Sequence, residues 1–390
     1  MRVAFVVQRY GDEVAGGAEA LCRQTAQALA RAGQEVTVYT TTARDYLRWA
    51  PYYDEGETVD DGVCVRRFAV EPPDPERAAT LLRRLALGDG AAGDERAWAL
   101  AQGPVSPRLL GSLAAGEDDV VALWTYLYAT TQLAMALVAE RAILVPLAHD
   151  EPMFRLGVTR GVVAMARGFA FLTAEERRLV DDVHGVGDRP WAEVGAGLHP
   201  RADGDAATAR TVRALPERFV LYVGRVDPAK GVDVLVRAHA AYRELGGSLG
   251  LVLAGRATGS ERLPEWVVQT GFIDEQERSD LFAACEVVAL PSTYESLSLV
   301  ALEAWQAGRP TLANARSDVL AGQTARSGGG LLYDTTESYA AQLRRMEDDP
   351  AMRESLGTSG ERWVSTHDWS EVVHRWQTLM HQVVPRGTPI

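Results

Sequence analysis

The segment that decides the fold spans residues 219–232 and reads FVLYVGRVDPAKGV. Its first residues, 219–223, are all apolar and have the length and the β-branched or aromatic character of a buried strand. A glycine-bearing loop follows, and from Val232 onward the apolar positions recur at helical spacing. A strand, a loop and a helix in this order, repeated along a chain, indicate an α/β protein with a parallel sheet.

The same alternation continues on both sides of this segment. Downstream of it we predict buried strands at 251–254, 287–290 and 311–313. Upstream of it we predict strands at 2–7, 36–39, 63–70, 120–124, 142–147 and 170–172. The segment from Glu71 to Gly103 interrupts the alternation with prolines, glycines and arginine-rich helical turns, and we interpret it as an insertion.

Two domains are expected, because a chain of 390 residues exceeds what one hydrophobic core usually serves. The alternation pauses around Gly197, and the polar, alanine-rich stretch 200–215 has the composition of a connection between domains. We therefore predict a first Rossmann-like domain at 1–197 and a second at 198–372. The last segment, 373–390, is predicted to form a helix that packs back on the first domain.

The composition excludes several classes of protein. Hydrophobic residues at 47% and charged residues at 24% are typical of a folded globular protein, and no apolar run reaches the roughly 20 residues of a membrane span. A net charge of -13 disfavours nucleic-acid binding. Three widely spaced cysteines favour neither a disulfide framework nor a zinc site, so we expect a cytoplasmic protein. Asp203-Gly204-Asp205 has the Asp-x-Asp form of some metal sites but follows no strand, so no metal is predicted.

Two motifs follow predicted strands and could carry chemistry. After residue 223 come Gly224, Arg225 and Lys230, where a glycine turn, a helix N-terminus and two cations would suit a diphosphate. After residue 290 come Glu295 and Glu303, eight positions apart. If both were helical, roughly 12 Å of helix axis would separate them, which is more than the roughly 5–9.5 Å between the two carboxyl groups of a glycosidase. The spacing suits the two ends of one long ligand instead.

Taken together, these motifs resemble a known family. The Glu-x7-Glu motif, the Gly224-Arg225…Lys230 element and Gly16-Gly17 near the N-terminus are similar to those of the large retaining glycosyltransferase family with the GT-B fold, glycosyltransferase family 4 or "glycosyl transferases group 1". Further matches are His149 with the residues after it, and Phe272-Ile273. They occur in the family's order over nearly the whole chain. The resemblance implies two Rossmann-like, doubly wound domains that face each other across a cleft.

The resemblance also implies roles for individual residues. Arg225 and Lys230 would hold the donor diphosphate, Glu303 the ribose hydroxyls, and Glu295 the hydroxyls of the transferred sugar. His149 would lie across the cleft as a hydrogen-bond donor to that sugar. Gly16, Gly17 and Gly224 would be further donor-binding residues, and Gly16 and Gly17 would approach the diphosphate or the acceptor where a side chain could not fit. The backbone around Phe272 and Ile273 would face the nucleobase. The backbone amides of Ser298, Leu299 and Val300 would reach the phosphate and the sugar.

The expected activity is therefore transfer of a hexose-type sugar, with retention and without a metal or other cofactor, from a UDP- or GDP-sugar to an acceptor hydroxyl. A growing glycan, a lipid-linked sugar and a specialised metabolite all remain open as acceptors. Two alternatives on the same scaffold are a nucleotide-sugar epimerase and a non-catalytic nucleotide-sugar-binding protein. A nicotinamide-dependent oxidoreductase is disfavoured because the N-terminal loop lacks GxGxxG.

Overall fold

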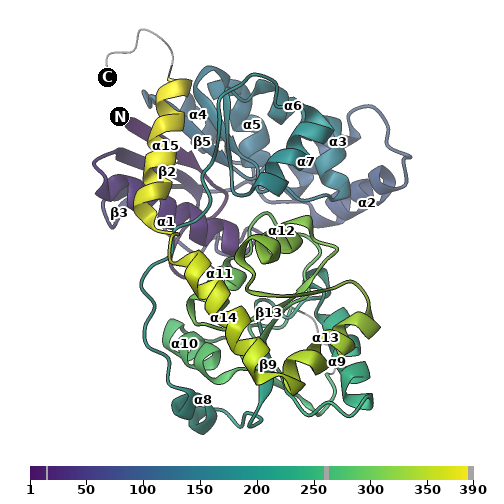
Figure 1. The fold of residues 1–390 in the computed structure, drawn as a ribbon. Coiled ribbons are helices and arrows are strands. Elements are labelled where there is room, and N and C mark those ends of the chain that lie inside the picture. The colour runs from purple at the N-terminus through teal and green to yellow at the C-terminus, as the bar shows by residue number, and fades with distance from the viewer. Residues whose placement is uncertain (15, 259–262, 385–390) are drawn as a thin grey trace. The chain divides into compact units, whose positions relative to one another are not determined.

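The computed structural model describes residues 1–14, 16–258 and 263–384, and the chain forms two compact units (Figure 1). The first unit comprises Met1–Ala196 together with the C-terminal segment from Trp369, and the second comprises Gly197–Asp368. The predicted division at Gly197 falls beside this boundary. The C-terminal segment, however, leaves the second unit at Trp369 rather than at residue 373.

The second unit is built on a six-stranded sheet in which every neighbouring pair is parallel. In sequence its strands are β9 (Phe219–Val223), β10 (Gly250–Ala254), β11 (Val267–Gly271), β12 (Val287–Leu290), β13 (Thr311–Asn314) and β14 (Gly330–Tyr333). Their order across the sheet is β11-β10-β9-β12-β13-β14. This is the 3-2-1-4-5-6 order of a doubly wound Rossmann sheet, whose direction of winding reverses between β9 and β12.

Helices bury both faces of this sheet. Alternate strand residues such as Val220, Leu251 and Val287 pack in one apolar cluster with side chains of α9 and α13, and β10 is buried along its whole length. The helices of the unit are α8 (Ala206–Val212), the 3₁₀ turn η3 (Pro228–Lys230), α9 (Val232–Glu244), α10 (Glu275–Ala284), α11 (Leu299–Gln306), α12 (Asp318–Ser327), α13 (Thr336–Asp348) and α14 (Pro350–Val364).

The first unit contains an eight-stranded sheet with the order β3-β4-β2-β1-β5-β6-β7-β8. Its strands are β1 (Arg2–Val6), β2 (Glu35–Thr41), β3 (Gly56–Asp60), β4 (Val63–Phe68), β5 (Val120–Trp124), β6 (Ala142–Val145), β7 (Gly168–Phe171) and β8 (Trp191–Glu193). All pairs are parallel except β3 with β4, which form an antiparallel pair at the edge. The direction of winding reverses between β1 and β5, so this sheet has the same doubly wound, Rossmann-like topology as the sheet of the other unit.

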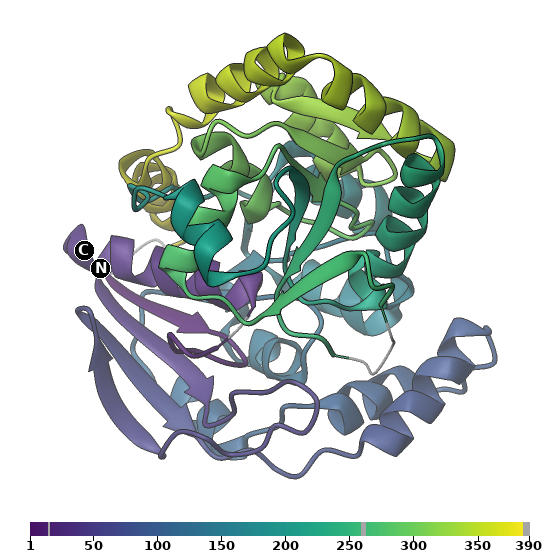
Figure 2. The same cartoon turned by 90° about the horizontal axis from the view of Figure 1, so that it is seen from below.

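The helices of the first unit include those of the expected insertion, α2 and α3, which project from the rest of the unit (Figure 2). The helical segments are α1 (Gly17–Arg31), α2 (Pro75–Ala86), α3 (Asp94–Gln102), α4 (Pro107–Ala114), α5 (Ala129–Val138), η1 (Ala139–Arg141), η2 (Pro152–Arg155), α6 (Gly157–Met165), α7 (Ala174–His184) and α15 (Trp369–Val383). The terminal helix α15 belongs to this unit, where Trp376 packs its ring against Phe5 and Trp124.

The structure confirms the strands predicted from apolar runs to within a few residues at their ends. Four strands were not predicted, namely β3, β8, β11 and β14. Of these, β3 is largely exposed and β8 is only three residues long, so neither gives an apolar run. β11 contains Gln269 and Thr270, and β14 begins at a glycine. Short edge strands of mixed polarity carry little periodic signal.

The stretch 200–215 is not a free connection, contrary to its composition. Residues 206–212 form α8, which packs on α10 in the second unit. The Asp205 N–H donates to Asp280 Oδ1 at 2.8 Å, and Arg213 pairs with Glu277 at 2.6 Å. The segments that enter and leave the second unit meet directly, because the Leu198 N–H donates to the His367 carbonyl at 2.9 Å.

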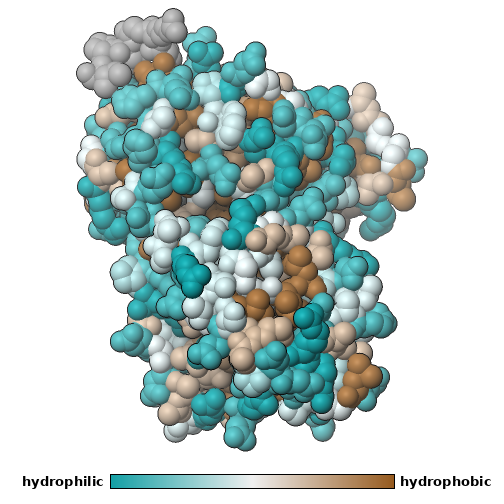
Figure 3. Space-filling model, viewed as in Figure 1, coloured by the Kyte–Doolittle hydropathy of each residue, from teal (hydrophilic) through white to brown (hydrophobic). Residues whose placement is uncertain are grey.

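The described parts of the chain, 1–14, 16–258 and 263–384, contain no helix long and apolar enough to cross a bilayer. On the face drawn in Figure 3, hydrophilic residues predominate and apolar residues form small patches.

Glycine is required where the loops after β9 and β10 approach each other. Gly255 has φ +148°, and a Cβ placed there would lie 1.8 Å from the Gly224 carbonyl oxygen. No side chain fits at this distance without moving the backbone. The close approach holds together the two strand ends on which the candidate site depends.

We expect Gly255→Ala to destabilise the protein by about 3 kcal/mol, because it adds both steric overlap and an unfavourable φ. Urea unfolding followed by tryptophan fluorescence measures the loss. Gly111→Ala is the matched control, since a Cβ at Gly111 in α4 meets nothing within 4 Å and alanine favours the helix. Equal stability of the two variants would contradict the steric argument.

Candidate active site

The candidate site of the second unit lies where two loops leave the same edge of its sheet. Residues 224–231 follow β9 and residues 291–298 follow β12, and these strands are neighbours at the point where the winding reverses. Ligands of open parallel sheets bind outside the carboxyl ends of the strands at this point. The topology therefore brings together motifs that are about 65 positions apart in sequence.

The loop after β9 is fixed by its own hydrogen bonds. The Tyr222 hydroxyl donates to the Arg225 carbonyl at 2.7 Å, and the Asp227 carboxylate accepts from the Ala229 N–H at 2.9 Å, which starts the turn η3. Gly231 ends the turn with φ +74°, and a Cβ there would lie 2.7 Å from the Pro291 carbonyl oxygen. The two loops thus touch at Gly231, and this contact places the neighbouring Lys230 beside the loop that follows β12.

Lys230 and Glu295 form an ion pair, with 3.1 Å between Nζ and Oε1. The Lys230 side chain is 34% exposed and that of Glu295 17% exposed, so both remain reachable from solvent. Lys230 is also the only lysine in the sequence, in which the other basic residues apart from histidine are arginines. Arg225 lies nearby in the loop, 3.7 Å from Asp227.

The second carboxylate, Glu303, lies in helix α11 rather than in the loop. Its Oε2 is paired with the guanidinium of Arg278 from α10, and its backbone carbonyl accepts from Arg201 at 3.4 Å. Burial raises the pKa of the Glu303 carboxyl, although the charges of Arg278 and Arg201 act in the opposite direction. Glu295 and Glu303 are therefore held by different cations, Lys230 and Arg278.

The start of α11 is less open than expected. Ser298 caps the helix by accepting from the Ala301 N–H at 3.3 Å, while its own N–H donates to Gln323 Oε1 at 3.1 Å. A phosphate could use the Ser298 amide only if Gln323 moved away. Leu299 and Val300 are the first two residues of the helix, where N–H groups commonly bind anions.

The end of β11 supplies the residues predicted to face a nucleobase. Gly271 has φ +74°, and Phe272 directly after it is 61% exposed. The Arg256 guanidinium, which follows β10, lies 4.9 Å from the centre of the Phe272 ring. An exposed aromatic ring with a cation on it forms a flat surface at the same edge of the sheet as Lys230.

The predicted glycines of the first unit, Gly16 and Gly17, lie at the start of α1. A Cβ at Gly16 would lie 2.1 Å from Glu19 Oε2, whereas one at Gly17 would meet nothing within 4 Å. Glu19 forms a buried ion pair with Arg9, with 2.5 Å between Nη2 and Oε1. Gly16 therefore makes room for this ion pair, which was not predicted because Arg9 belongs to no recognisable motif.

His149 follows β6 in the first unit and lies against the carboxylate of Glu151. Its Nδ1 lies 3.3 Å from Glu151 Oε1, and the Tyr126 hydroxyl donates to the same oxygen. Burial acts to raise the pKa of Glu151, but the hydrogen bonds from His149 and Tyr126 outweigh it and leave the pKa below its ordinary value. An ionised Glu151 accepting from Nδ1 would fix the orientation of the His149 ring.

The loop that carries His149 is held by a buried glutamate, Glu176, which is 1% exposed. Its two oxygens accept from the Ala148 N–H at 2.8 Å and from the Leu172 N–H at 2.6 Å. Leu147, just before Ala148, has φ +54°, a strained conformation for this residue. The sequence Thr173-x-x-Glu176 has the form of a capping box, in which the Glu176 carboxylate would accept from the backbone of Thr173. The carboxylate accepts instead from the N–H groups of Ala148 and Leu172, which follow two strands. The sequence pattern therefore does not reveal that Glu176 supports the His149 loop.

The structure thus brings Arg225, Lys230, Glu295, Glu303 and Phe272 to one edge of the second sheet, and it places Gly16, Gly17 and His149 in the first unit. Within 1–14, 16–258 and 263–384 no three histidine, cysteine, aspartate or glutamate side chains cluster as metal ligands do. Asp205 of the Asp-x-Asp sequence instead caps α8 by accepting from the Ala207 N–H.

Comparison with known proteins fits this geometry. The family described as "Glycosyl transferases group 1" matches residues 205–363. D-inositol 3-phosphate glycosyltransferase from Kineococcus radiotolerans is 30% identical over 92% of this chain and 88% of its own length. The chain belongs to the group 1 glycosyl transferases. D-inositol 3-phosphate glycosyltransferase 1 from Catenulispora acidiphila is 29% identical over 97% of this chain and 93% of its own.

Solved structures confirm the GT-B fold of this group 1 glycosyl transferase. Sucrose-phosphate synthase from Thermosynechococcus elongatus superimposes with a TM-score of 0.75 and 19% identity, covering 98% of both chains. HepE from Anabaena, in complex with UDP and glucose, gives a TM-score of 0.68 and 16% identity over 98% of this chain and 99% of its own. The family and the fold inferred from the motifs are therefore both correct.

The pKa of Glu176 predicts a pH dependence of stability. Burial raises this pKa to about 8, although the N–H groups that it accepts from lower it. The folded state thus holds a proton that the unfolded state releases near pH 4.5, so the stabilisation is complete below that pH and is lost as the pH rises through about 8. We expect the melting temperature to fall between pH 5.5 and 8.5, and to fall less in Glu176→Gln.

Glu140→Gln is the control for this experiment, because Glu140 is an exposed glutamate of the same unit and its replacement should leave the slope unchanged. A wild-type slope in Glu176→Gln would show that Glu176 does not titrate in this range.

Proposed function

We propose that this glycosyltransferase moves a hexose-type sugar, with retention of configuration, from a UDP- or GDP-sugar to a hydroxyl of a glycan, a lipid-linked sugar or a specialised metabolite. The observation that carries the proposal is the Lys230–Glu295 pair at 3.1 Å, at the carboxyl ends of two strands where the winding reverses. It combines a cation for a diphosphate with a carboxylate for sugar hydroxyls in one partly exposed site.

The proposed donor lies along the edge of the second sheet. Lys230 and Arg225 hold the diphosphate, Glu295 accepts from hydroxyls of the sugar, and Glu303 accepts from the ribose hydroxyls. Gly224 and the amides of Leu299 and Val300 approach the phosphates, and that of Ser298 joins them when Gln323 moves away. Phe272 and Ile273 lie at the base. His149, Gly16 and Gly17 are proposed as the first unit's contacts to the sugar and the diphosphate.

Both carboxylates are paired with cations in this structure, and donor binding would exchange these pairs for contacts to the ligand. Lys230 would transfer from Glu295 to a phosphate, which is a stronger acceptor because it carries more charge. Partly exposed ion pairs contribute about 0–1 kcal/mol, so the exchange costs little. The released Glu295 carboxylate is then free to accept from sugar hydroxyls.

Retention is proposed to arise by a front-face reaction. The bond between the anomeric carbon and the β-phosphate oxygen breaks, and both electrons stay with the phosphate. The acceptor oxygen forms its bond to the same face of the sugar, and its proton passes to the departing phosphate oxygen. Arg225 and Lys230 balance the charge that grows on this phosphate, so neither a metal nor another cofactor is included in the proposal.

The names of structural neighbours support a nucleotide-sugar donor. HepE is described in complexes with UDP and with UDP-glucose, and a structure described as "Trehalose-6-phosphate from E. coli" is bound with UDP-2-fluoro glucose. UDP-sugars are therefore the first donors to test, and GDP-sugars the second.

Lys230→Ala should lower kcat by about 100-fold or more, with a smaller change in KM, because the charge that Lys230 balances is largest in the transition state. Steady-state kinetics with the active donor measure this. Arg237→Ala, which removes an exposed cation paired with Asp233 on α9, is the control and should stay within two-fold of wild type. Unchanged turnover in Lys230→Ala would remove this residue from the mechanism.

The single lysine allows the same assignment to be tested without activity. An amine-selective acetylating reagent can modify only Lys230 and the N-terminal amine. Mass spectrometry should show that the donor nucleotide protects Lys230 and leaves the N-terminus unprotected. Equal protection of both amines would contradict a diphosphate site at Lys230.

A panel of UDP-, GDP-, ADP- and TDP-sugars should contain one nucleotide that raises the melting temperature of the wild type, since a ligand of the folded state stabilises it by mass action. Glu303→Gln should lose most of this stabilisation, because the amide accepts less strongly from the ribose hydroxyls. Glu361→Gln, an exposed glutamate on α14, is the matched control.

No stabilisation by any nucleotide sugar would contradict the proposed donor site. If a donor bound and was isomerised without an acceptor, the reaction would be an epimerisation rather than a transfer.

A further inference from the structure

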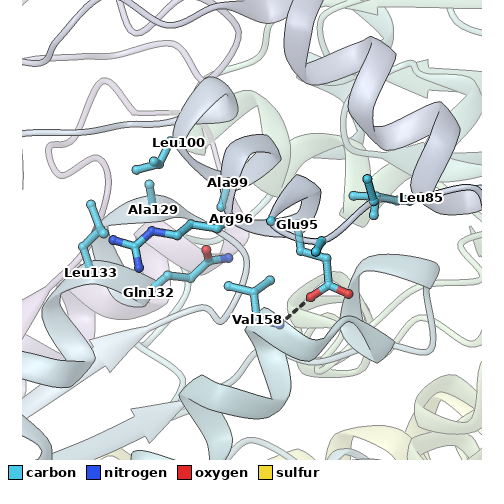
Figure 4. Close-up of a pocket in the computed structure, with 13 residues that line it drawn as sticks. Leu85, Glu95, Arg96, Ala99, Leu100, Ala129, Gln132, Leu133 and Val158 are labelled. Atoms are coloured by element: carbon cyan, nitrogen blue, oxygen red, sulfur yellow. Dashed lines mark hydrogen bonds between the residues drawn. The ribbon is translucent and has the colours of Figure 1, made fainter.

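The first unit contains a cavity of about 420 Å³ under the insertion (Figure 4). Its walls come from the end of α2, from α3 and the residues before it, from α5, and from the start of α6. The lining residues include Glu95, Arg96, Leu100, Gln132, Leu133 and Val158. A volume of this size lies within the range of small-molecule sites.

Two helices that line the cavity begin at the edge of the sheet that carries His149. Helix α5 begins directly after the loop that follows β5, and α6 begins directly after the loop that contains His149. Leu81 and Trp98 of the insertion pack in one apolar cluster with Leu127 and Met153, which lie in or directly after those loops. The insertion therefore packs on the two loops at this edge of the first sheet.

The walls are mostly apolar. Of their three polar side chains, Glu95 and Gln132 form hydrogen bonds to the backbone, whereas Arg96 forms none with the part of the chain that the structure describes. Glu95 accepts from the Val158 N–H at 2.8 Å, and the Gln132 amide donates to the Leu127 carbonyl at 3.2 Å. In Figure 4 the Arg96 side chain extends from α3 toward Gln132 and Leu133, while Glu95 points toward Val158. Among the described residues, none forms an ion pair with Arg96 or accepts a hydrogen bond from its guanidinium.

Apolar side chains also remain exposed around the cavity. Leu100 lines it and is 39% exposed, and Leu87 in the loop after α2 is 71% exposed. At the right of Figure 3, where Figure 1 places α2, hydrophobic residues reach the surface. Apolar surface beside a cavity with one unpaired cation is the chemistry of a site for an amphipathic anion.

We propose that this cavity binds the acceptor, and that the acceptor is a small molecule with an apolar ring or chain and an anionic group that pairs with Arg96. This inference rests on the proposed function and narrows its acceptor from three classes to one, a specialised metabolite. Arg96 is exposed, so an incoming anion can reach its guanidinium, and the apolar residues that line the cavity beside it would contact the ring or chain. The apolar walls supply affinity, and Arg96 selects the charged form.

The test uses 1-anilinonaphthalene-8-sulfonate, a fluorescent apolar anion, with the full-length folded protein. Fluorescence titration should show saturable binding that Arg96→Glu weakens at least ten-fold. Arg83→Glu is the matched control, because it makes the same charge change on α2 outside the cavity and should alter the Kd less than two-fold. Equal effects of the two variants would overturn the proposal, since the probe would then sense only the charge of the insertion.

Competition and transfer assays then test the acceptor assignment. In the wild type, 6-hydroxy-2-naphthoate should displace the probe at lower concentration than 2-naphthol does, and this preference should disappear in Arg96→Ala. Mass spectrometry with the stabilising nucleotide sugar should detect glycosylated hydroxynaphthoate. Displacement without any glycosylated product would overturn the acceptor assignment, while donor-induced stabilisation in the same samples would show that the donor site is intact. Loss of that stabilisation would instead contradict the proposed function.

Discussion

Parallel pairing of β9 with both β10 and β12 is the constraint on which the donor side of this protein depends. Because the strands are parallel, their carboxyl ends lie at the same edge of the sheet, and the loops that follow them all begin at this edge. Reversal of the winding between β9 and β12 sends the following helices to opposite faces and leaves the space beyond these two strands open. Gly231 and Gly255 then allow the loops to approach more closely than any side chain would permit. The proposal of a binding site at this edge therefore rests on its position in the sheet.

Two carboxylates at this edge are each paired with a cation. Lys230 is paired with Glu295, and Arg278 with Glu303, so each of these four charges has a partner of opposite sign within the fold. The pairs are partly exposed, and water can replace either partner at small cost. A ligand that offers phosphate to the cation and hydroxyls to the carboxylate satisfies both members of a pair at once. Selectivity for such a ligand follows from the need to satisfy both, because a simple anion would leave Glu295 without its partner.

Short stretches of sequence were sufficient to predict the strands and the motifs that directly follow them. The apolar runs of β9 and β12 and the residues directly after them identified the sheet and the fold family, and they indicated the edge at which we propose that the donor binds. Short stretches of sequence did not predict the interactions between residues that are far apart in the chain. Glu176 binds the amide of Ala148, 28 positions away, and Arg278 reaches Glu303 from another helix. The stretch 200–215 has the composition of a linker, yet its polar side chains bind α10. The cavity under the insertion depends on how α3 packs on α5, which no motif records.

The meeting of Leu198 with His367 has a consequence for how such proteins can change over time. The second unit is one continuous stretch of chain whose two ends are hydrogen-bonded to each other, while the first unit is completed by the segment that returns from it. A recombination event that replaced the coding sequence of this stretch would exchange all the proposed donor contacts of the second unit. It would create only two new junctions in the chain, and these lie next to each other in the fold. The insertion and the His149 loop would be inherited unchanged. If the proposed sites are right, such an exchange would alter the donor preference and leave the acceptor preference in place.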